Sequence, residues 1–317
     1  MLRKPGPTRF NRQTILPYLL IAPAFIVIAP FAIFPFFYSI YLSLHDFSAT
    51  ETVFLGLEHY RNALGNADFW NSAWITVYFA VGTIPPALVL SLLIALGLYR
   101  IKGLQHVLRT AYFLPFVTSI VAAAMVWRSL LEPTTGPLTQ FMLEVGLSPQ
   151  QWLLEPRGIL HLMSGGKIDV GVGPSLALCC IMVFEIWRST GFMIVIFLAA
   201  LTQRDRHLEE AAQLDGATSG QVVRHIVLPI LSPAIFFLTI VSVIQSFQSF
   251  SSFYALTGDG RGPVDTTQNL IVYIYTNLYE NEKFGYGSAV ATMLSVAIMV
   301  FTFVQWRATR RRVHYAS

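Results

Sequence analysis

Six long apolar runs constrain this chain more than any other feature of its sequence. They lie near residues 15–44, 70–98, 107–131, 174–201, 229–256 and 287–306. An α-helix needs about 20 predominantly apolar residues to cross the hydrocarbon core of a bilayer. We therefore predict an all-α integral membrane protein with six spans. The composition agrees, because 54% of the residues are hydrophobic and only 12% are charged, against roughly a quarter charged in soluble domains.

The first apolar run follows a basic stretch, as the apolar core of a secretory signal peptide does. That core is only about 7–15 residues long, whereas this run continues past Phe37. We interpret it as a retained span. Prolines at positions 17, 23, 30 and 35 predict a kinked or interrupted helix, because each removes a backbone donor.

Lysine and arginine gather in alternate loops, which predicts the orientation in the membrane. One side holds 14 of the 21 basic residues: Arg3, Lys4, Arg9, Arg12, Arg100, Lys102, Arg109, Arg204, Arg206, Arg224, Arg307, Arg310, Arg311 and Arg312. That side is expected to be cytoplasmic, with both termini. The predicted parts are a tail over 1–14, a transmembrane domain over 15–306 and a basic tail over 307–317. Within the domain, 202–228 is a cytoplasmic loop, and 132–173 is an external loop that either meets a partner or only connects two spans.

The residue patterns of common catalytic sites are absent. Gly166-Lys167 lacks the other residues of a phosphate loop, since His161 and Ile168 stand where glycine and Ser or Thr belong. The seven histidines form no HExxH pattern, and no GxSxG occurs. Cys179 and Cys180 are adjacent, which favours packing over a disulfide or a metal site. We predict a chain with no catalytic residue, metal or cofactor of its own. Its basic residues are not interleaved with aromatics, which argues against nucleic-acid binding.

The loop over residues 208–229 carries the most specific pattern. Glu209 and Glu210 are placed where a helix dipole favours negative charge. Gly216 can adopt the left-handed conformation that ends a helix. Thr218 followed by Gln221 is a capping box that begins another helix. The loop is therefore predicted to be two short helices joined at a bend, with the fifth span beginning beyond them.

This loop resembles the EAA loop of binding-protein-dependent ABC import permeases. The matching positions are Glu210, Ala211, Ala212, Gly216, Ile226, Leu228 and Pro229. Asp215-Gly216-Ala217 is the form typical of the carbohydrate-uptake branch, which includes maltose and glycerol-3-phosphate permeases. The similarity extends over nearly the whole chain. One departure is that Asp259 and Arg261 interrupt a turn that is commonly Thr-Gly-Gly-Gly-Pro in the family.

The resemblance implies a six-helix bundle of the type I ABC importer permease kind in a bacterial inner membrane. It also implies a set of partners: a second homologous permease, two ATP-binding cassette subunits, an extracytoplasmic solute-binding protein and the lipid bilayer. ATP and magnesium would bind to the cassette subunits. The residues around Glu209 to Pro229 would couple this chain to them.

The fifth and fourth spans contain polar side chains that could line a solute path. Gln245, Gln248, Ser249 and Ser252 follow the spacing of one helical face, with Phe250 and Tyr254 close by. Such groups can bind a polyol, but they can equally hold helices together. In the fourth span, Glu185 and Arg188 lie one turn apart beside Trp187. A structural ion pair is the favoured interpretation, with a place in the path as the alternative.

Three hypotheses about the transport function remain open: two differ in the solute, and one differs in the class of transporter. The leading hypothesis is a carbohydrate, whether a mono-, di- or oligosaccharide. The region from Gln305 onward is similar to the glycerol-3-phosphate branch. Glycerol-3-phosphate or a glycerophosphodiester is therefore the alternative solute. A stand-alone secondary transporter belongs to another class. We disfavour it because the six spans show no inverted repeat.

Overall fold

The computed structural model describes residues 12–47, 52–101, 103–169, 172–202, 211–212 and 214–309. These residues belong to two compact units. One contains the residues up to Ala63 together with Asn277–Thr292, and the other contains Leu64–Thr276 together with the residues from Met293 onward.

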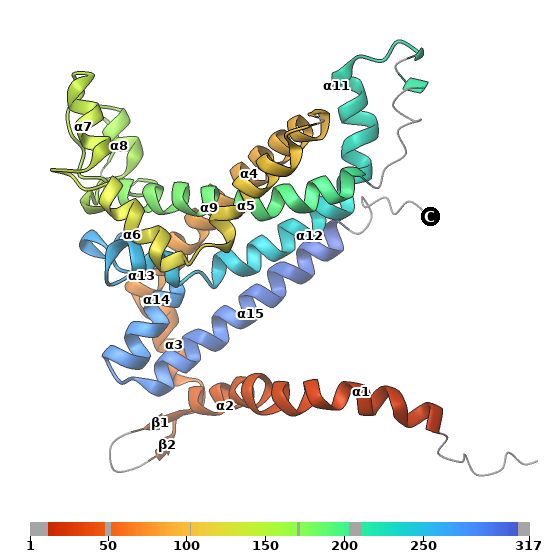
Figure 1. Cartoon of the computed structure of the whole chain (residues 1–317). Helices are drawn as coiled ribbons and strands as arrows, with labels where there is room; N and C mark the ends of the chain where they lie inside the picture. The colour runs from red at the N-terminus through yellow and green to blue at the C-terminus, as the bar shows by residue number, and fades with distance from the viewer. Residues whose placement is uncertain are drawn as a thin grey trace, which may run out of the picture. The chain divides into compact units, whose positions relative to one another are not determined.

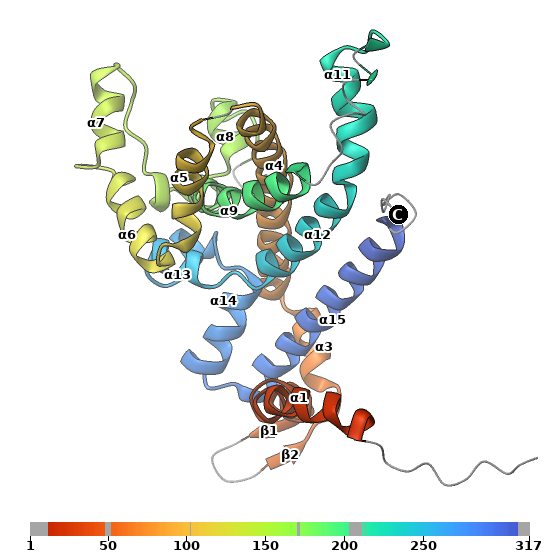
Figure 2. The same cartoon turned by 45° about the vertical axis from the view of Figure 1, so that its right-hand side comes forward.

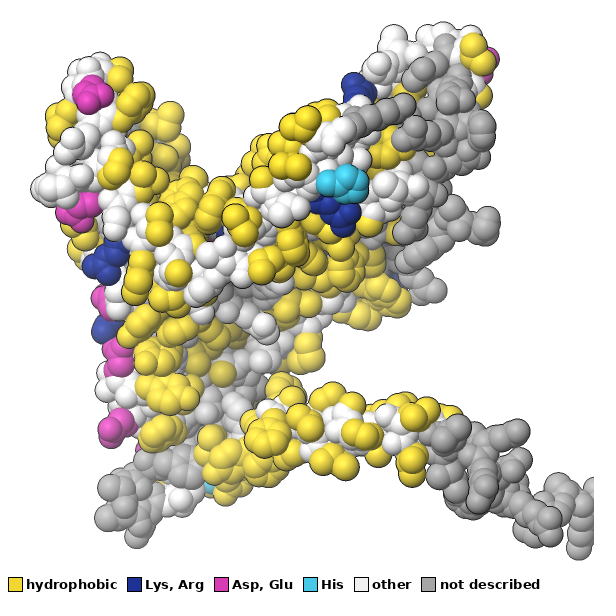
Figure 3. Space-filling model, viewed as in Figure 1, with side chains coloured by type: hydrophobic (Ala, Val, Ile, Leu, Met, Phe, Trp, Pro, Cys, Tyr) yellow, Lys and Arg dark blue, Asp and Glu magenta, His cyan; other side chains and the backbone are white. Residues whose placement is uncertain are grey.

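The first unit begins with one long apolar rod. Helix α1 (Arg12–Ile28) passes through a π-helical turn, η1 (Ala29–Ile33), into α2 (Phe34–Ser43). Pro30 stands in the first turn of η1, so the predicted interruption is a widened turn that accommodates the missing donor. From Pro17 to the end of α2, the face seen in Figure 3 is mostly hydrophobic, and most of its large apolar side chains are exposed. Such a surface is typical of a helix that faces lipid or other membrane helices.

A short β-hairpin follows α2 and is an addition to the predicted all-α fold. Strand β1 (His45–Phe47) pairs antiparallel with β2 (Thr52–Phe54). Helix α3 (Glu58–Gly65) comes next, and its buried His59 places Nε2 3.2 Å from the carbonyl oxygen of His45. The π-helical turn η5 (Thr276–Glu280) and the beginning of α15 (Phe284–Thr309) complete this unit.

The second unit is a helical bundle. Its long helices are α4 (Ala67–Arg100), α9 (Leu176–Thr202), α12 (Leu228–Phe247) and the remainder of α15. Shorter elements are α5 (Gln105–Val117), α6 (Ile120–Leu130), α7 (Pro137–Glu144), η2 (Trp152–Leu154), α8 (Ile159–Met163), α11 (Ser219–Val222), η3 (Val223–Val227), α13 (Ser251–Thr257), η4 (Pro263–Asp265) and α14 (Leu270–Tyr275).

Helix α9 lies at the centre of this bundle. It packs against α4, α5, α12 and α13, while α4 also contacts α12 and α14. One hydrophobic cluster joins α4, α6, α9, α13 and α14 around Phe79, Phe184 and Phe253. A second joins α4, α9, α11 and α12 around Phe197 and Leu231. The polar pocket described below lies between the helices that these clusters hold together.

The described residues contain five helices long and apolar enough to cross a membrane, or six if the bent pair α5 and α6 counts as one span. They agree with the six predicted runs in position. Two details differ. The third run is bent by 94° between α5 and α6. The fifth begins earlier than predicted, at Ser219, and its long helix ends at Phe247 rather than near residue 256.

Candidate functional site

The loop before the fifth span ends its first helix with a defined backbone motif. Gly216 has φ of +85°, which confirms the predicted left-handed conformation. The N–H of Ala217 donates to the carbonyl oxygen of Ala212 at 2.9 Å, and the N–H of Asp215 donates to Ala211 at 3.0 Å. The bond from Ala217 back to Ala212 is the long-range bond of a Schellman motif with Gly216 at C′. Glu209 and Glu210, which were also predicted to belong to this site, lie outside the described residues.

The predicted capping box is formed. The N–H of Thr218 donates to Oε1 of Gln221 at 2.8 Å, and the N–H of Gln221 donates to Oγ1 of Thr218 at 3.4 Å. The prediction of a separate second short helix is wrong, because α11 does not end before the fifth span. It continues without a break through the π-helical turn η3 into α12, along a curved path (Figures 1 and 2). Pro229 is tolerated in the first turn of α12, where the wider π turn precedes it.

One side of this bend is packed and the other is open. Ala212, Ala217 and Ile226 pack against the hydrophobic cluster of α4, α9 and α12. Leu214 is 89% exposed, and a Cβ added to Gly216 would meet nothing within 4 Å. Sequence reasoning missed Leu214, although its place directly before Asp215-Gly216, in the last helical turn, could have indicated an outward position.

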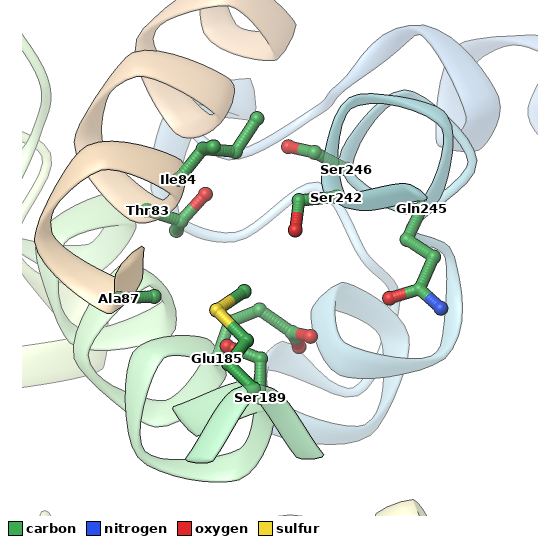
Figure 4. Close-up of a pocket in the computed structure, with 9 residues that line it drawn as sticks. Thr83, Ile84, Ala87, Glu185, Ser189, Ser242, Gln245 and Ser246 are labelled. Carbon is green, nitrogen blue, oxygen red and sulfur yellow. The ribbon is translucent and has the colours of Figure 1, made fainter. Parts of the chain in front are cut away.

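A polar pocket lies between α4, α9 and α12 (Figure 4). Its polar lining is four hydroxyls, one amide and one carboxylate. The lining residues are Thr83, Ile84, Ala87, Glu185, Ser189, Met193, Ser242, Gln245 and Ser246. The cavity volume is about 20 Å³, and a single water needs about 10–15 Å³ measured in this way. In this conformation the pocket is therefore too small for a sugar.

The hydroxyl of Ser246 is a buried pocket group without a hydrogen-bond partner. Ser246 is 6% exposed, and its Oγ has no hydrogen-bond partner. Thr83, in contrast, donates to the carbonyl oxygen of Phe79 at 2.7 Å. A buried hydroxyl without a partner costs about 1–3 kcal/mol. A ligand or water in the pocket would relieve that cost, so the pocket is chemically prepared to receive a hydrogen-bonding group.

The predicted polar face of span five is not continuous, because the helix breaks. Helix α12 ends at Phe247 and α13 begins at Ser251, with Gln248 at φ −101° and ψ 10° between them. Gln245 lines the pocket but Gln248, Ser249 and Ser252 do not. Sequence reasoning missed Ser242 and Ser246, which share the face of Gln245. The same spacing rule, begun one turn earlier, would have found them.

Asn269 holds the broken ends of span five. It is fully buried, and its Nδ2 donates to the carbonyl oxygen of Ser249 at 2.6 Å. Its Oδ1 accepts from the N–H of Val272 at 3.0 Å and thereby caps α14. Non-helical backbone at membrane depth is found where protein groups satisfy it or where it borders a cavity. The break has both features nearby.

The predicted ion pair between Glu185 and Arg188 is formed. Nη2 of Arg188 donates to Oε1 of Glu185 at 2.6 Å. Oε2 of Glu185 also accepts from the hydroxyl of Ser252 at 2.7 Å, so the carboxylate links α9 to α13. The guanidinium carbon of Arg188 lies 6.0 Å from the ring centre of Phe116 on α5. Among the two charged groups, only Glu185 lines the pocket.

The predicted aromatic residues lie in two groups rather than one. Trp187 contacts Trp127 of α6, with ring centres 5.5 Å apart. Phe250 stacks on Tyr254 at 5.2 Å and contacts Tyr275 at 4.9 Å. None of these rings lines the pocket, so their place in a solute path stays a prediction.

The segment predicted as the external loop contains ordered structure. Its Glu155 is 5% exposed, and its two carboxylate oxygens accept from Nε and Nη2 of Arg157 at 2.7 Å each. These hydrogen bonds hold the pKa of Glu155 below its usual value, against the opposing effect of its burial. The same pairing raises the pKa of Arg157. The pair therefore stabilises the turn before α8.

Among the described residues, no group of three or more His, Cys, Asp or Glu side chains is placed to hold a metal ion. In the same residues Cys179 and Cys180 are free thiols within α9.

The family model described as "Binding-protein-dependent transport system inner membrane component" matches residues 64–314. The chain belongs to this family. As an inner membrane component of such a transport system, it covers nearly the full length of several curated relatives. The trehalose/maltose transport system permease protein MalF of Thermococcus litoralis is 30% identical over 95% of this chain and 96% of its own length. The sn-glycerol-3-phosphate transport system permease protein UgpA of Agrobacterium fabrum is 29% identical over 95% and 97%.

A solved structure shows that this family member has the fold predicted for it. A chain of a bacterial alginate ABC transporter, in complex with an alginate pentasaccharide-bound periplasmic protein, aligns with a TM-score of 0.79. The alignment covers 96% of this chain and 98% of the other, at 20% sequence identity. The type I permease fold is therefore confirmed.

Proposed function

We propose that this chain is one of two permease subunits of an ATP-driven carbohydrate importer. The observation that carries the proposal is the bend at Gly216, which presents Leu214 outward from a motif packed on the bundle by Ala212 and Ala217. A rigid, exposed bend continuous with a membrane helix can transmit motion between a soluble partner and the span. Two ATP-binding cassette subunits, which bind ATP and magnesium, are the partners proposed for residues 208–229.

The other partners follow from the family. A second homologous permease supplies the other half of the solute path, and an extracytoplasmic solute-binding protein delivers the solute. The relatives named above include a trehalose/maltose permease, which supports a carbohydrate as the solute. The asymmetry of Lys and Arg supports a cytoplasmic location for both termini. This orientation places the bend at Gly216 on the ATPase side and Glu155 on the side of the binding protein.

Reconstitution tests this proposal. The chain is copurified with its partner subunits, placed in liposomes and supplied with the binding protein and radiolabelled sugars. We expect uptake that requires ATP, the cassette subunits and the binding protein together. Uptake by this chain alone, driven by an ion gradient, would show a stand-alone secondary transporter instead.

Gln245 offers a finer test of the path. Gln245→Ala removes a neutral hydrogen-bonding group from the pocket, and such a loss costs about 0.5–1.5 kcal/mol. We expect the half-saturating sugar concentration for transport to rise several-fold. Gln248→Ala is the matched control, because Gln248 lies at the break just beyond α12 and does not line the pocket. Equal shifts in both variants would show that the path does not follow the pocket.

A further inference from the structure

The buried charge of the pocket is one-sided. Six polar side chains line it, and they include the carboxylate of Glu185 but no lysine, arginine or histidine. The cation that pairs with Glu185 is Arg188, which does not line the pocket and whose guanidinium carbon lies 6.0 Å from the ring centre of Phe116. The ion pair is therefore a dipole whose negative end faces the pocket.

We infer that Glu185 is a specificity-determining residue, which admits uncharged, hydroxyl-rich solutes and excludes anionic ones. This inference rests on the proposed function, since it assigns a substrate class to the same path. A like charge facing an anion is strongly unfavourable where little water screens it. A phosphate or a uronate in the pocket would meet the carboxylate without a lining cation to compensate.

A neutral polyol has the complementary groups. Its hydroxyls can donate to Glu185 and to the amide oxygen of Gln245, and they can accept from Ser246. Ser246 is 6% exposed, and its buried hydroxyl has no hydrogen-bond partner. This hydroxyl points into the space between α4, α9 and α12 (Figure 4). This orphaned donor is an independent indication that a hydrogen-bonding solute occupies the pocket at some stage of transport.

The local field can be measured without knowing the solute. Ser246→Cys is introduced into a chain in which Cys179 and Cys180 are replaced by alanine, within the assembled complex during ATP turnover. The thiolate attacks an alkyl methanethiosulfonate, so that a mixed disulfide forms and methanesulfinate leaves. Three reagents are compared: a trimethylammonium cation, a sulfonate anion and a neutral hydroxyethyl compound. The ratio of cation to anion rates is normalised to that of a small thiol in solution.

We expect the normalised ratio to be at least about tenfold in favour of the cation, which corresponds to about 1.4 kcal/mol. Glu185→Gln should lower the ratio to one or below, because Arg188 then stands unpaired. Ser252→Ala removes a hydrogen bond from Glu185 but keeps the charge, so it should leave the ratio high. Comparing the two variants distinguishes the effect of the charge of Glu185 from the effect of its hydrogen bond to α13.

Each other outcome overturns the inference. A normalised ratio near one, or one that favours the anion, in the Ser246→Cys protein would do so even if Glu185→Gln fails to assemble. Absence of labelling by the neutral reagent during turnover would show that no aqueous path reaches the pocket. The uptake assay on the unlabelled complex tests the proposed function separately, because an importer whose pocket lacks this field would still transport.

Discussion

The bend at Gly216 and the break after Phe247 both interrupt helices, but different forces maintain them. The bend is closed by hydrogen bonds among neighbours in sequence, and a Cβ at Gly216 would meet only open space. The break is held by Asn269, which lies 20 residues beyond Ser249 and is itself fully buried in the bundle. An interruption that is stabilised only by neighbouring residues leaves its outer surface available to bind a partner. One held by distant residues belongs to the internal packing and is expected to tolerate little change.

Gly191 tests the packed side of this comparison and should show the largest effect on stability. A Cβ there would overlap the carbonyl oxygen of Tyr112 and lie 3.2 Å from the Cα of Phe113. Backbone atoms cannot swing aside, so Gly191→Leu should cost about 3 kcal/mol or more and separate α5 from α9. Size-exclusion chromatography and thermal unfolding in detergent would measure the loss. Gly97→Leu is the control, since a Cβ at Gly97 meets nothing within 4 Å. Equal stability of the two variants would contradict the α5–α9 contact.

Asn269 should show the next largest effect, because two hydrogen bonds depend on its buried side chain. Asn269→Ala leaves the Ser249 carbonyl and the Val272 N–H without their partner, at about 1–3 kcal/mol for each group. Asn66→Ala is the matched control, since Asn66 caps α4 from a half-buried position with one bond to the N–H of Asp68. A lost cap typically costs about 1 kcal/mol. If thermal unfolding showed the same loss for both, the claim that Asn269 maintains the break would fail.

Glu155 extends the comparison to a small, local motif. Its lowered pKa means that the pair with Arg157 contributes stability above the usual glutamate pKa and loses it as the pH falls through the lowered value. Glu155→Gln should therefore increase hydrogen exchange of residues 152–177 at pH 7 relative to the wild type. The difference should shrink at acid pH, where the wild type loses its charge. Glu144→Gln, at an exposed site on α7, should show no difference at either pH, and a pH-independent effect at Glu155 would point to packing alone.

The local interruption was predictable from the sequence, whereas the distant one was not. Gly216 and the pair of Thr218 and Gln221 follow short rules that need only a few neighbouring residues. The break was missed because the apolar character of span five continues through Phe250 and Phe253, and apolar patterning alone does not report a partner such as Asn269. For the same reason, the sequence predicted only some of the residues that line the pocket. Gln245 and Glu185 were singled out as polar residues in spans, but only the packing of three helices showed which of their neighbours they meet.

We propose that this chain couples ATP hydrolysis on separate subunits to solute movement through the bend at Gly216. The most direct measurement is the number of sugars imported per ATP hydrolysed, in reconstituted complexes that carry either Gly216→Val or Gly220→Val. Both positions have open space for a Cβ, but only Gly216 has positive φ, which a β-branched residue cannot readily adopt. We expect Gly216→Val to lower this ratio greatly, or to detach the cassette subunits, and Gly220→Val to leave the ratio close to wild type. An unchanged ratio in Gly216→Val, with all subunits retained, would contradict the claim.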